Sequence, residues 1–322
     1  MAFAVPLPAL AAAHCAAPTL AAALAAEAQA GGAGGLTGAR AADAGAGGAS
    51  ATPPPPPTLR LHAGAAMLPH PDKVAKGGED AFFLSPDGLS LGVADGVGGW
   101  GELGIDAGEY SRALMRHCAD EAAALTAAAG GARPASGPDP SAVLTAAHAR
   151  TRAQGSATAC VLAMRPGEKG EPALAAANVG DSGFVVARAG AVAFKSPPQQ
   201  HGFNFPYQLG APGAAGDSPA DADVFRVALR AGDVVVAGTD GLFDNVFAEE
   251  AASMACASAA AGEGPAAAAA TLAAFARSRA ADPLCASPFA LAAQAMGYPY
   301  RGGKMDDITV VVAYVAEKTG GV

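Results

Sequence analysis

Residues 234–241 read Val-Val-Val-Ala-Gly-Thr-Asp-Gly, an apolar, β-branched run that leads directly into an Asp-Gly pair. The pattern recurs at residues 91–96, Leu-Gly-Val-Ala-Asp-Gly. Each aspartate follows a predicted strand, where a short side chain projects from a rigid support and the glycine lets the backbone turn closely. Other acidic residues stand at the ends of further predicted strands: Glu79-Asp80, Asp181 and Asp306-Asp307. We therefore expect carboxylates from distant parts of the chain to gather at one end of a sheet structure.

Such a cluster has an electrostatic consequence. Neighbouring carboxylates repel one another and raise one another's pKa unless a cation neutralises them. Ligation by oxygen alone, without Cys or His, is typical of the hard ions Mg²⁺ and Mn²⁺. Four or five acids can hold two ions, which can clamp a phosphoryl group and generate a hydroxide nucleophile. A single Asp-Gly pair is usually an ordinary turn, but two pairs after apolar strands, with acidic pairs opening two others, favour a metal centre.

Composition excludes several other classes of protein. The chain has 322 residues and a formal net charge of −9. No block of Lys and Arg offsets this charge, which argues against binding to the phosphates of nucleic acid. The five cysteines, at positions 15, 118, 160, 256 and 285, include no Cys-x-x-Cys pair. That spacing favours reduced, mostly buried thiols over a disulfide framework or a zinc site.

Residues 1–58 differ in composition from the rest of the chain. Residues 1–26 are rich in Ala and interrupted by Pro, so we expect no membrane-spanning helix there. No positive charge precedes Arg40, whereas a secretory signal needs an early one. Residues 28–58 are Gly/Ala-rich and end in a run of prolines, which predicts a disordered linker. We expect 1–58 to be a disordered Ala/Gly/Pro-rich targeting leader and linker, 59–316 a folded domain, and 317–322 a flexible tail.

Within 59–316, β-branched and aromatic runs bounded by Gly, Pro and Asp predict strands. The predicted strands are 81–85, 89–94, 157–164, 174–179, 184–187, 192–194, 224–229, 234–238 and 308–315. Residues 106–129, with Asp106 as N-cap, repeat apolar side chains at helical spacing. Residues 248–296 predict two or three Ala-rich helices. Because strands and helices do not alternate strictly, we expect an α+β domain of mainly antiparallel sheets.

Five motifs carry a family resemblance. They are GGED at 77–80, VADGVGGW at 93–100, GDSG at 180–183, TDGLFDN at 239–245 and GGKMDDIT at 302–309. In sequence and order they resemble the motifs of the metal-dependent type 2C Ser/Thr protein phosphatases, over residues 59 to 315. Residues 68–74, 199–201 and 205–209 resemble the plant and algal subgroup that contains the chloroplast photosystem II core phosphatase. The mitochondrial matrix phosphatases of the family are the next most similar.

The resemblance implies a four-layer α-β-β-α sandwich with a binuclear Mn²⁺ or Mg²⁺ centre at one end and a weaker third site. Asp95 would bridge both ions and the Gly96 carbonyl would bind one. Asp307 stands where the family usually has Asn, so it is assigned to the outer shell. The implied metal ligands are Asp80, Asp95, Gly96, Asp240 and Asp306, of which Asp95, Asp240 and Asp306 are the catalytic set; the outer-shell or third-metal residues are Glu79, Asp181 and Asp307.

The resemblance also implies an activity and a setting. The activity is hydrolysis of phosphoserine and phosphothreonine by direct attack of a metal-bridging hydroxide, with no phosphoenzyme. The implied partners are phosphoprotein substrates, with thylakoid proteins such as photosystem II core subunits foremost. We expect a monomer in the chloroplast stroma, with the mitochondrial matrix as the alternative.

Two positions depart from the family pattern. Many members have His directly after the bridging Asp-Gly, as the proposed leaving-group acid, and here that residue is Val97. The usual phosphate-binding Arg is replaced by Ala75, and Lys73 or Lys76 is a candidate substitute. Metal-bound water, His70 or His201 could supply the missing acid. The long segment 195–223 corresponds to the variable flap of the family, and its candidate substrate contacts are His201, Phe205 and Tyr207.

Two other functions remain as alternatives. A catalytically silent relative that binds phosphoproteins would explain the changes at positions 97 and 75, although it would have no need to keep three mutually repelling acids. Residues 96–101 satisfy the dinucleotide pattern Gly-x-Gly-x-x-Gly. The acids about 20 residues further on lie in a predicted helix instead of at a strand end, so the sequence disfavours a nucleotide site.

Overall fold

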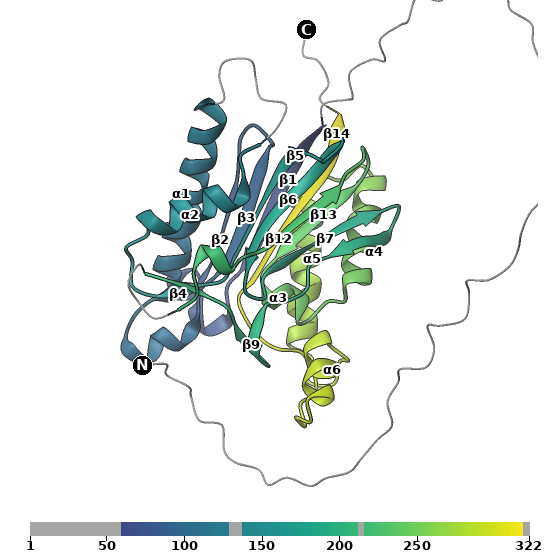
Figure 1. Ribbon diagram of the computed structural model, residues 1–322. Helices are drawn as coiled ribbons and strands as arrows, with labels where there is room; N and C mark the ends of the chain where they lie inside the picture. Colours follow the sequence, from purple (N-terminus) through teal and green to yellow (C-terminus); the bar gives the residue numbers. More distant parts are fainter. Residues whose placement is uncertain (1–58, 129–136, 212–215, 318–322) are drawn as a thin grey trace, which may run out of the picture. The chain divides into compact units, whose positions relative to one another are not determined.

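The computed structural model describes residues 59–128, 137–211 and 216–317 (Figure 1). The strands are β1 (Leu59–Leu68), β2 (Asp80–Leu84), β3 (Ser90–Asp95), β4 (Ser156–Ala157), β5 (Ala159–Pro166), β6 (Pro172–Val179), β7 (Gly183–Arg188), β8 (Ala191–Lys195), β9 (Gln200–Gly202), β10 (Phe205–Pro206), β11 (Leu209–Gly210), β12 (Asp223–Ala228), β13 (Val234–Gly238) and β14 (Ile308–Glu317). The helices are α1 (Ala107–Ala128), α2 (Pro140–Arg150), α3 (Asp240–Phe243), α4 (Ala248–Ala260), α5 (Pro265–Ala280) and α6 (Pro288–Ala295), with 3₁₀ turns η1 (Pro71–Lys76), η2 (Gly98–Leu103) and η3 (Pro219–Asp221).

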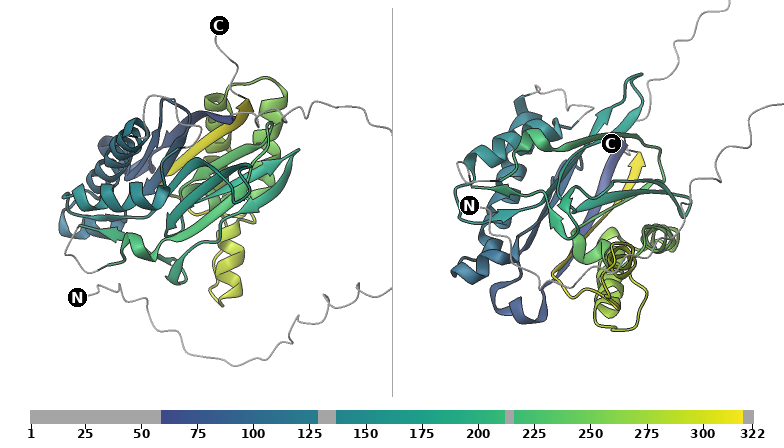
Figure 2. Two further views of the ribbon diagram at one scale, coloured as in Figure 1. Left: turned by 45° about the horizontal axis from the view of Figure 1, so that its top comes forward. Right: turned by 60° about the horizontal axis from the view of Figure 1, so that its bottom comes forward.

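Two five-stranded antiparallel sheets form the centre of the domain. Their strand orders are β1-β14-β13-β7-β8 and β12-β6-β5-β3-β2. Helices α4 and α5 pack on the first sheet, and α1 and α2 pack on the second. The helix pairs therefore lie outside the two sheets, as Figure 2 shows. This is the four-layer α-β-β-α sandwich expected from the sequence.

Three apolar layers hold the sandwich together. One lies between the sheets and includes Leu91, Leu162 and Phe184. The second lies between the first sheet and helices α4 and α5 and is built largely from Val and Ala. The third fills the space between the second sheet and helices α1 and α2, around Tyr110. Small Ala side chains let the helices approach the sheets closely, which is how so Ala-rich a sequence supports a dense core.

The central strands are continuously apolar because both of their faces are covered by other parts of the domain. In β13, Val235 and Ala237 face the other sheet, whereas Val234 and Val236 face the helices. Because successive side chains of a strand point to opposite faces, a strand that is covered on both faces must be apolar at every position. β14 follows the same rule, and these two apolar runs become neighbouring strands.

All nine predicted strands are present, with shifts of a few residues at their ends. Two longer elements went unpredicted. β1 pairs with β14 over ten residues, and its Ala/Gly-rich sequence gave no strand signal. Its Gly64 lies under α5, where an added Cβ would be 2.3 Å from the backbone nitrogen of Ala266. Helix α2, which packs against α1, was also missed.

Some expectations concern parts of the chain that lie outside the described residues. The leader and linker at 1–58 and the tail from residue 318 onward belong there, so they stay predictions. Glu317, which we assigned to the tail, is the last residue of β14. In the part of the chain that the structure describes, every helix is too short or too polar to cross a membrane.

Candidate metal centre

The acidic residues gather at one edge because antiparallel strands start and end there alternately. Asp80, the first residue of β2, is paired in register with Asp95, the last residue of β3. On the first sheet, Gly238 at the end of β13 pairs with Gly183 at the start of β7 and Val310 near the start of β14. Asp240, Asp181 and Asp306, which flank these strand ends, are therefore brought to one region. The expected convergence of the acids is thus present.

Thr239 links the two sheets at this edge. Its hydroxyl donates to Asp80 Oδ2 at 2.9 Å and accepts the backbone N–H of Thr309 at 3.1 Å. One carboxylate oxygen of Asp80 is thereby fixed, and the other, Oδ1, is buried without a hydrogen-bond partner. Asp95 is held through its backbone, whose N–H donates to Thr158 Oγ1 at 3.1 Å.

The glycine of each Asp-Gly pair is required because another segment of backbone passes too close to it to leave room for a side chain. A Cβ on Gly96 would lie 2.7 Å from the carbonyl oxygen of Glu79 and 2.9 Å from that of Ala107. A Cβ on Gly241 would lie only 1.9 Å from the carbonyl oxygen of Asp307. Since real side chains do not approach backbone oxygens so closely, only glycine lets these segments converge behind the carboxylates.

The buried carboxylates perturb one another. Loss of water and the neighbouring carboxylates of Asp240 and Asp80 raise the pKa of Asp95 well above its ordinary value. Burial and the nearby Asp307 likewise raise the pKa of Asp80. Burial, together with Asp240, raises the pKa of Asp306 to about 6 and that of Asp181 to about 6. These shifts are the repulsion expected of acids that crowd one site.

Lys304 lies among the carboxylates, a position that sequence analysis missed. Its Nζ is 2.5 Å from Asp240 Oδ2, 2.8 Å from Asp244 Oδ2 and 3.6 Å from Asp306 Oδ2. Burial opposes the charge on Lys304, but the three aspartates outweigh it and raise its pKa. The ammonium in turn helps to lower the pKa of Asp240, although burial acts against that shift. The available signal was a lysine two residues before a predicted ligand.

Asp244 was also missed as a member of the site. It follows α3 and accepts the Lys304 ammonium, and burial raises its pKa to about 7 against the opposing effect of that ammonium. Its sequence signal was weak because it stands inside the TDGLFDN motif, at a position to which we gave no role.

A second lysine bridges two of the outer acids. Lys73, on η1, has its Nζ 2.5 Å from Glu79 Oε2 and 3.1 Å from Asp307 Oδ2. The buried Asp307 also accepts the backbone N–H groups of His70 at 2.7 Å and Glu79 at 3.1 Å. Asp307 therefore fastens the segment that carries Lys73 to the start of β14. Lys76, the other candidate, is an exposed residue at the end of the same turn.

The predicted flap residues lie on the β9–β10 hairpin and just after it. The rings of His201 and Tyr207 stack at 3.8 Å, and His201 Nε2 lies 3.0 Å from Asp217 Oδ1. Phe205 is exposed and its ring centre is 5.3 Å from that of His201. Phe203, between them in sequence, instead stacks on Tyr298 at 5.2 Å. The flap aromatics thus divide into two groups with different neighbours.

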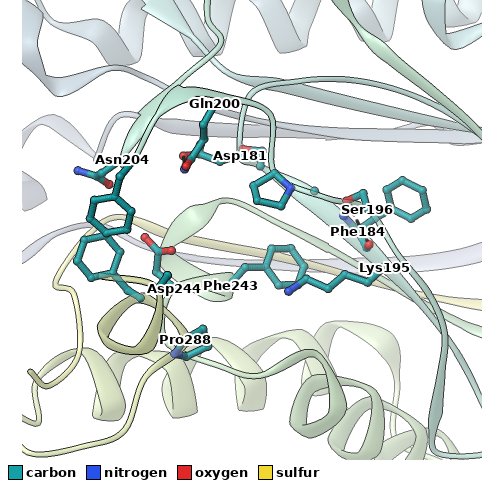
Figure 3. A pocket seen from close by; sticks show the side chains of 15 residues that line it. Asp181, Phe184, Lys195, Ser196, Gln200, Asn204, Phe243, Asp244 and Pro288 are labelled. Carbon is teal, nitrogen blue, oxygen red and sulfur yellow. Dashed lines mark hydrogen bonds between the residues drawn. The ribbon is translucent and has the colours of Figure 1, made fainter. Parts of the chain in front are cut away.

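A cavity of about 230 Å³ adjoins the acidic site (Figure 3). Asp181 and Asp244 line it, so it is continuous with the carboxylate cluster. Phe203 belongs to its wall, whereas His201, Phe205 and Tyr207 are not among its lining residues. Gln200 donates to Asp181 Oδ2 at 2.9 Å and leaves Asp181 Oδ1 buried without a partner.

The donor set suits hard divalent ions. The acidic side chains that converge here offer carboxylate oxygens, the ligands that Mg²⁺ and Mn²⁺ prefer, and no Cys or His ligand is among them. Three of these oxygens, Asp80 Oδ1, Asp181 Oδ1 and Asp240 Oδ1, are buried without a hydrogen-bond donor. In the described ranges, no three Asp, Glu, His or Cys side chains form a ready-made ligand group, and lysine ammonium groups lie between the carboxylates instead. These residue types are suited to bind the ions. To coordinate them, the carboxylates would have to move closer to one another than they are in the metal-free protein.

Comparisons with known proteins agree with this architecture, although no family model matches the chain. The chain is 48% identical over 258 residues to probable protein phosphatase 2C 80 of Arabidopsis thaliana, a match that spans 80% of this chain and 59% of that protein. It is 39% identical over 273 residues to probable protein phosphatase 2C 26 of the same plant, covering 80% of this chain and 84% of that protein. The solved structure of the photosystem II phosphatase PBCP superposes with a TM-score of 0.68 at 36% identity, over 79% of this chain and 98% of that one. The chain belongs to the protein phosphatase 2C family.

Proposed function

We propose that this protein is a metal-dependent phosphatase of phosphoserine and phosphothreonine residues in proteins. The observation that carries the proposal is the set of buried, unpaired carboxylate oxygens on Asp80, Asp181 and Asp240. An anionic oxygen that is buried without a donor is costly, and a bound cation removes that cost. These oxygens come from three separate strand ends. The fold thus brings together potential metal ligands that accept no hydrogen bond within the protein.

The residues that would hold the ions are the ones that the fold gathers. When bound, Mn²⁺ or Mg²⁺ would neutralise these acids, polarise the phosphoryl oxygens and lower the pKa of the attacking water. Glu79, Asp181 and Asp307 would act from the outer shell or at a third, weaker site. The proposed ligands are Asp80, Asp95, Asp240, Asp306 and the carbonyl of Gly96.

Lys73 is the residue best placed to bind the phosphoryl group in place of the absent arginine. Its ammonium has three N–H donors, and Glu79 and Asp307 occupy two of them. Although burial acts against the charge, these two carboxylates raise the pKa of Lys73, so it stays cationic. The third donor remains for a phosphoryl oxygen. Lys76 is the weaker candidate because it is exposed at the end of the turn.

The two buried cysteines, Cys118 and Cys160, are unsuited to a phosphatase mechanism that forms a cysteinyl-phosphate. Such a mechanism needs a thiolate, and therefore a lowered thiol pKa at an accessible position. Cys118 and Cys160 are buried, and burial raises the pKa of both thiols, to about 12 for Cys160. Neither of these thiols is therefore suited to act as the nucleophile, which favours direct hydrolysis at the acidic site.

The proposed substrates are chloroplast phosphoproteins, with photosystem II core subunits first. Similarity to the photosystem II phosphatase PBCP supports this choice, together with the leader-like composition of residues 1–58. The chain spans little more than half the length of two of the curated relatives that it matches. A fluorescent fusion of residues 1–58 tests the location: import into chloroplasts is expected, and accumulation in mitochondria would favour the alternative matrix location.

Hydrolysis of p-nitrophenyl phosphate and a phosphothreonine peptide tests the activity. We expect turnover with Mn²⁺, none in chelator, and recovery when Mn²⁺ is restored. Asp95→Asn and Asp240→Asn should each lower turnover by more than about 100-fold, beyond the usual effect of an outer-shell residue. Asp72→Asn is the matched control, since its side chain is exposed at 90%. Mn²⁺ binding without turnover would instead support the silent phosphoprotein-binding alternative, and turnover in chelator would contradict the metal-dependent mechanism.

A further inference from the structure

Ser156 is a buried residue that connects the loop after Asp95 to the flap. Its carbonyl accepts the N–H of Val97 at 2.9 Å, and its strand, β4, pairs with β11 just after the flap hairpin. Its hydroxyl accepts the indole N–H of Trp100 at 2.7 Å and donates to Gln208 Oε1 at 2.6 Å. Because an indole N–H can only donate, the single hydroxyl proton of the serine is left for Gln208. These two side-chain bonds form what we call the Ser156 link.

Gln208 carries the Ser156 link into the flap. It directly follows Tyr207, whose ring stacks on that of His201 at 3.8 Å. The backbone N–H of Gln208 donates to Asp217 Oδ2 at 2.8 Å, and Asp217 Oδ1 lies 3.0 Å from His201 Nε2. Both flap rings are thus held to the residue that Ser156 fixes.

The β9–β10 hairpin depends on such anchors for its position. Its strands have three and two residues, form a sheet of their own, and β9 is exposed along its length. A two-stranded hairpin is only marginally stable by itself. At its start, the N–H of Gln199 donates to the carbonyl of Gly180 at 2.9 Å, and at its end the anchor is Gln208. Hydrogen bonds at the base of the hairpin therefore decide where its exposed rings stand.

We propose that Trp100, Ser156 and Gln208 are positioning residues that hold the flap where it receives the polypeptide around the phosphorylated residue. The inference rests on the proposed phosphatase function. Trp100 lies five residues after Asp95, the proposed bridging ligand, so the Ser156 link joins the flap to the loop that leaves the metal centre. A peptide substrate therefore finds the flap rings at a set distance from the phosphoryl site, and less ordering is needed when it binds. A small aryl phosphate, which has no polypeptide, gains nothing from this arrangement.

Ser156→Ala removes both bonds of the link and tests its role in substrate choice. The measure is kcat/KM for a phosphothreonine peptide divided by kcat/KM for p-nitrophenyl phosphate. We expect this ratio to fall about tenfold, through a higher KM for the peptide, because the flap must then be ordered during binding. Ser278→Ala, which removes an exposed hydroxyl on α5, is the matched control and should keep the ratio. Equal ratios for the two variants would overturn the proposal.

Trp100→Phe is a second variant that leaves the buried serine in place. It keeps an aromatic ring but has no N–H donor, so the ratio should fall by about threefold, in keeping with the loss of one hydrogen bond. A Trp100→Phe protein with the ratio of the unaltered protein would mean that the indole does not help to position the flap.

Trp100 is the only tryptophan in the sequence, so its fluorescence reports directly on the Ser156 link. The probe is a phosphonate analogue of the phosphothreonine peptide, which binds without being hydrolysed, added in the presence of Mg²⁺. Its binding should shift the Trp100 emission of the unaltered protein and leave that of Gln208→Met unchanged, because the flap of this variant no longer bonds to Ser156. A shift of equal size in Gln208→Met, or none in the unaltered protein, would contradict the proposed link.

The kinetic and fluorescence experiments separate the two proposals. If neither p-nitrophenyl phosphate nor the peptide is hydrolysed, it is the proposed phosphatase function that fails. If both are hydrolysed and the ratio is the same in the unaltered protein, Ser156→Ala and Trp100→Phe, the phosphatase function stands and the positioning role of the Ser156 link fails.

Discussion

The hydroxyl of Thr239 donates to Asp80 Oδ2 across 2.9 Å, although the two residues are 159 positions apart in the chain. Thr239 follows β13 of one sheet, and Asp80 begins β2 of the other. The bond thus joins the two sheets at the edge where the acids converge. Because the same hydroxyl accepts the N–H of Thr309, its donor direction is fixed toward the carboxylate.

Replacing Thr239 by Val should weaken metal binding. The substitution keeps the shape of the side chain but frees Asp80 to rotate and leaves the Thr309 N–H without its acceptor. We expect the Kd for Mn²⁺, measured by calorimetric titration, to rise by about tenfold, the usual effect of losing a residue that orients a ligand. Thr239→Ser keeps the hydroxyl and should behave like the unaltered protein. Equal affinities for the Val and Ser variants would show that the bond has no orienting role.

Lys304 should act as an internal counter-ion, so its replacement by Met should have opposite effects with and without metal. In chelator, loss of the ammonium leaves Asp240 and Asp244 uncompensated and should lower the free energy of unfolding by about 3 kcal/mol. With Mn²⁺ present, the competing positive charge is gone, so the ion should bind more tightly and raise the melting temperature by more than it does in the unaltered chain.

Thermal unfolding in chelator and over a Mn²⁺ series measures both effects. Lys304→Arg changes the shape of the side chain but keeps its charge. It is therefore the control that separates the effect of the charge from the effect of altering the side chain. The same Mn²⁺-induced rise in melting temperature for the Met variant and the unaltered chain would mean that Lys304 and the ions do not share the carboxylates.

Much of this site could be predicted from the sequence because the positions of several acids depend only on the residues next to them in the chain. An apolar run predicts a strand, and an acid at its end must project from the edge, so the positions of Asp95 and Asp240 follow from short stretches of chain. Lys304 and Asp244 could not be placed in the same way, since their roles depend on which acids stand beside them after folding. β1 was missed for a similar reason. Its Ala/Gly-rich sequence has little strand propensity, and its position depends on pairing with β14 and on the approach of α5 over Gly64.

The neighbouring acids Asp306 and Asp307 should respond differently to replacement by Asn. Burial and Asp240 raise the pKa of Asp306 to about 6, so its ionised form destabilises the metal-free protein. This penalty is absent below the ordinary Asp pKa of about 4, grows as the pH rises toward the folded-state pKa of about 6, and is complete above it. In chelator, Asp306→Asn should therefore stabilise the protein by about 2 kcal/mol at pH 8 and have little effect near pH 3, while greatly weakening Mn²⁺ binding.

Asp307→Asn should instead destabilise the metal-free protein by about 2 kcal/mol at pH 8. An amide cannot accept all three donors that Asp307 satisfies, and the unpaired N–H of a buried group is costly. Denaturant unfolding of both variants in chelator gives the comparison. A stabilised Asp307→Asn, or an Asp306→Asn whose effect does not depend on pH, would contradict the division of roles between the two residues.

Gly241→Ala tests whether backbone approach behind the carboxylates is essential. The new Cβ would be placed 1.9 Å from the carbonyl oxygen of Asp307, so α3 must move away from the start of β14 and carry Asp240 with it. We expect a loss of about 3 kcal/mol in unfolding free energy, at the upper end for a single added methyl in a packed region, together with weaker Mn²⁺ binding. Gly101→Ala is the control, because a Cβ there meets nothing within 4 Å and should change stability by less than about 0.5 kcal/mol. If the two variants are equally stable, the close approach of these segments does not constrain residue 241.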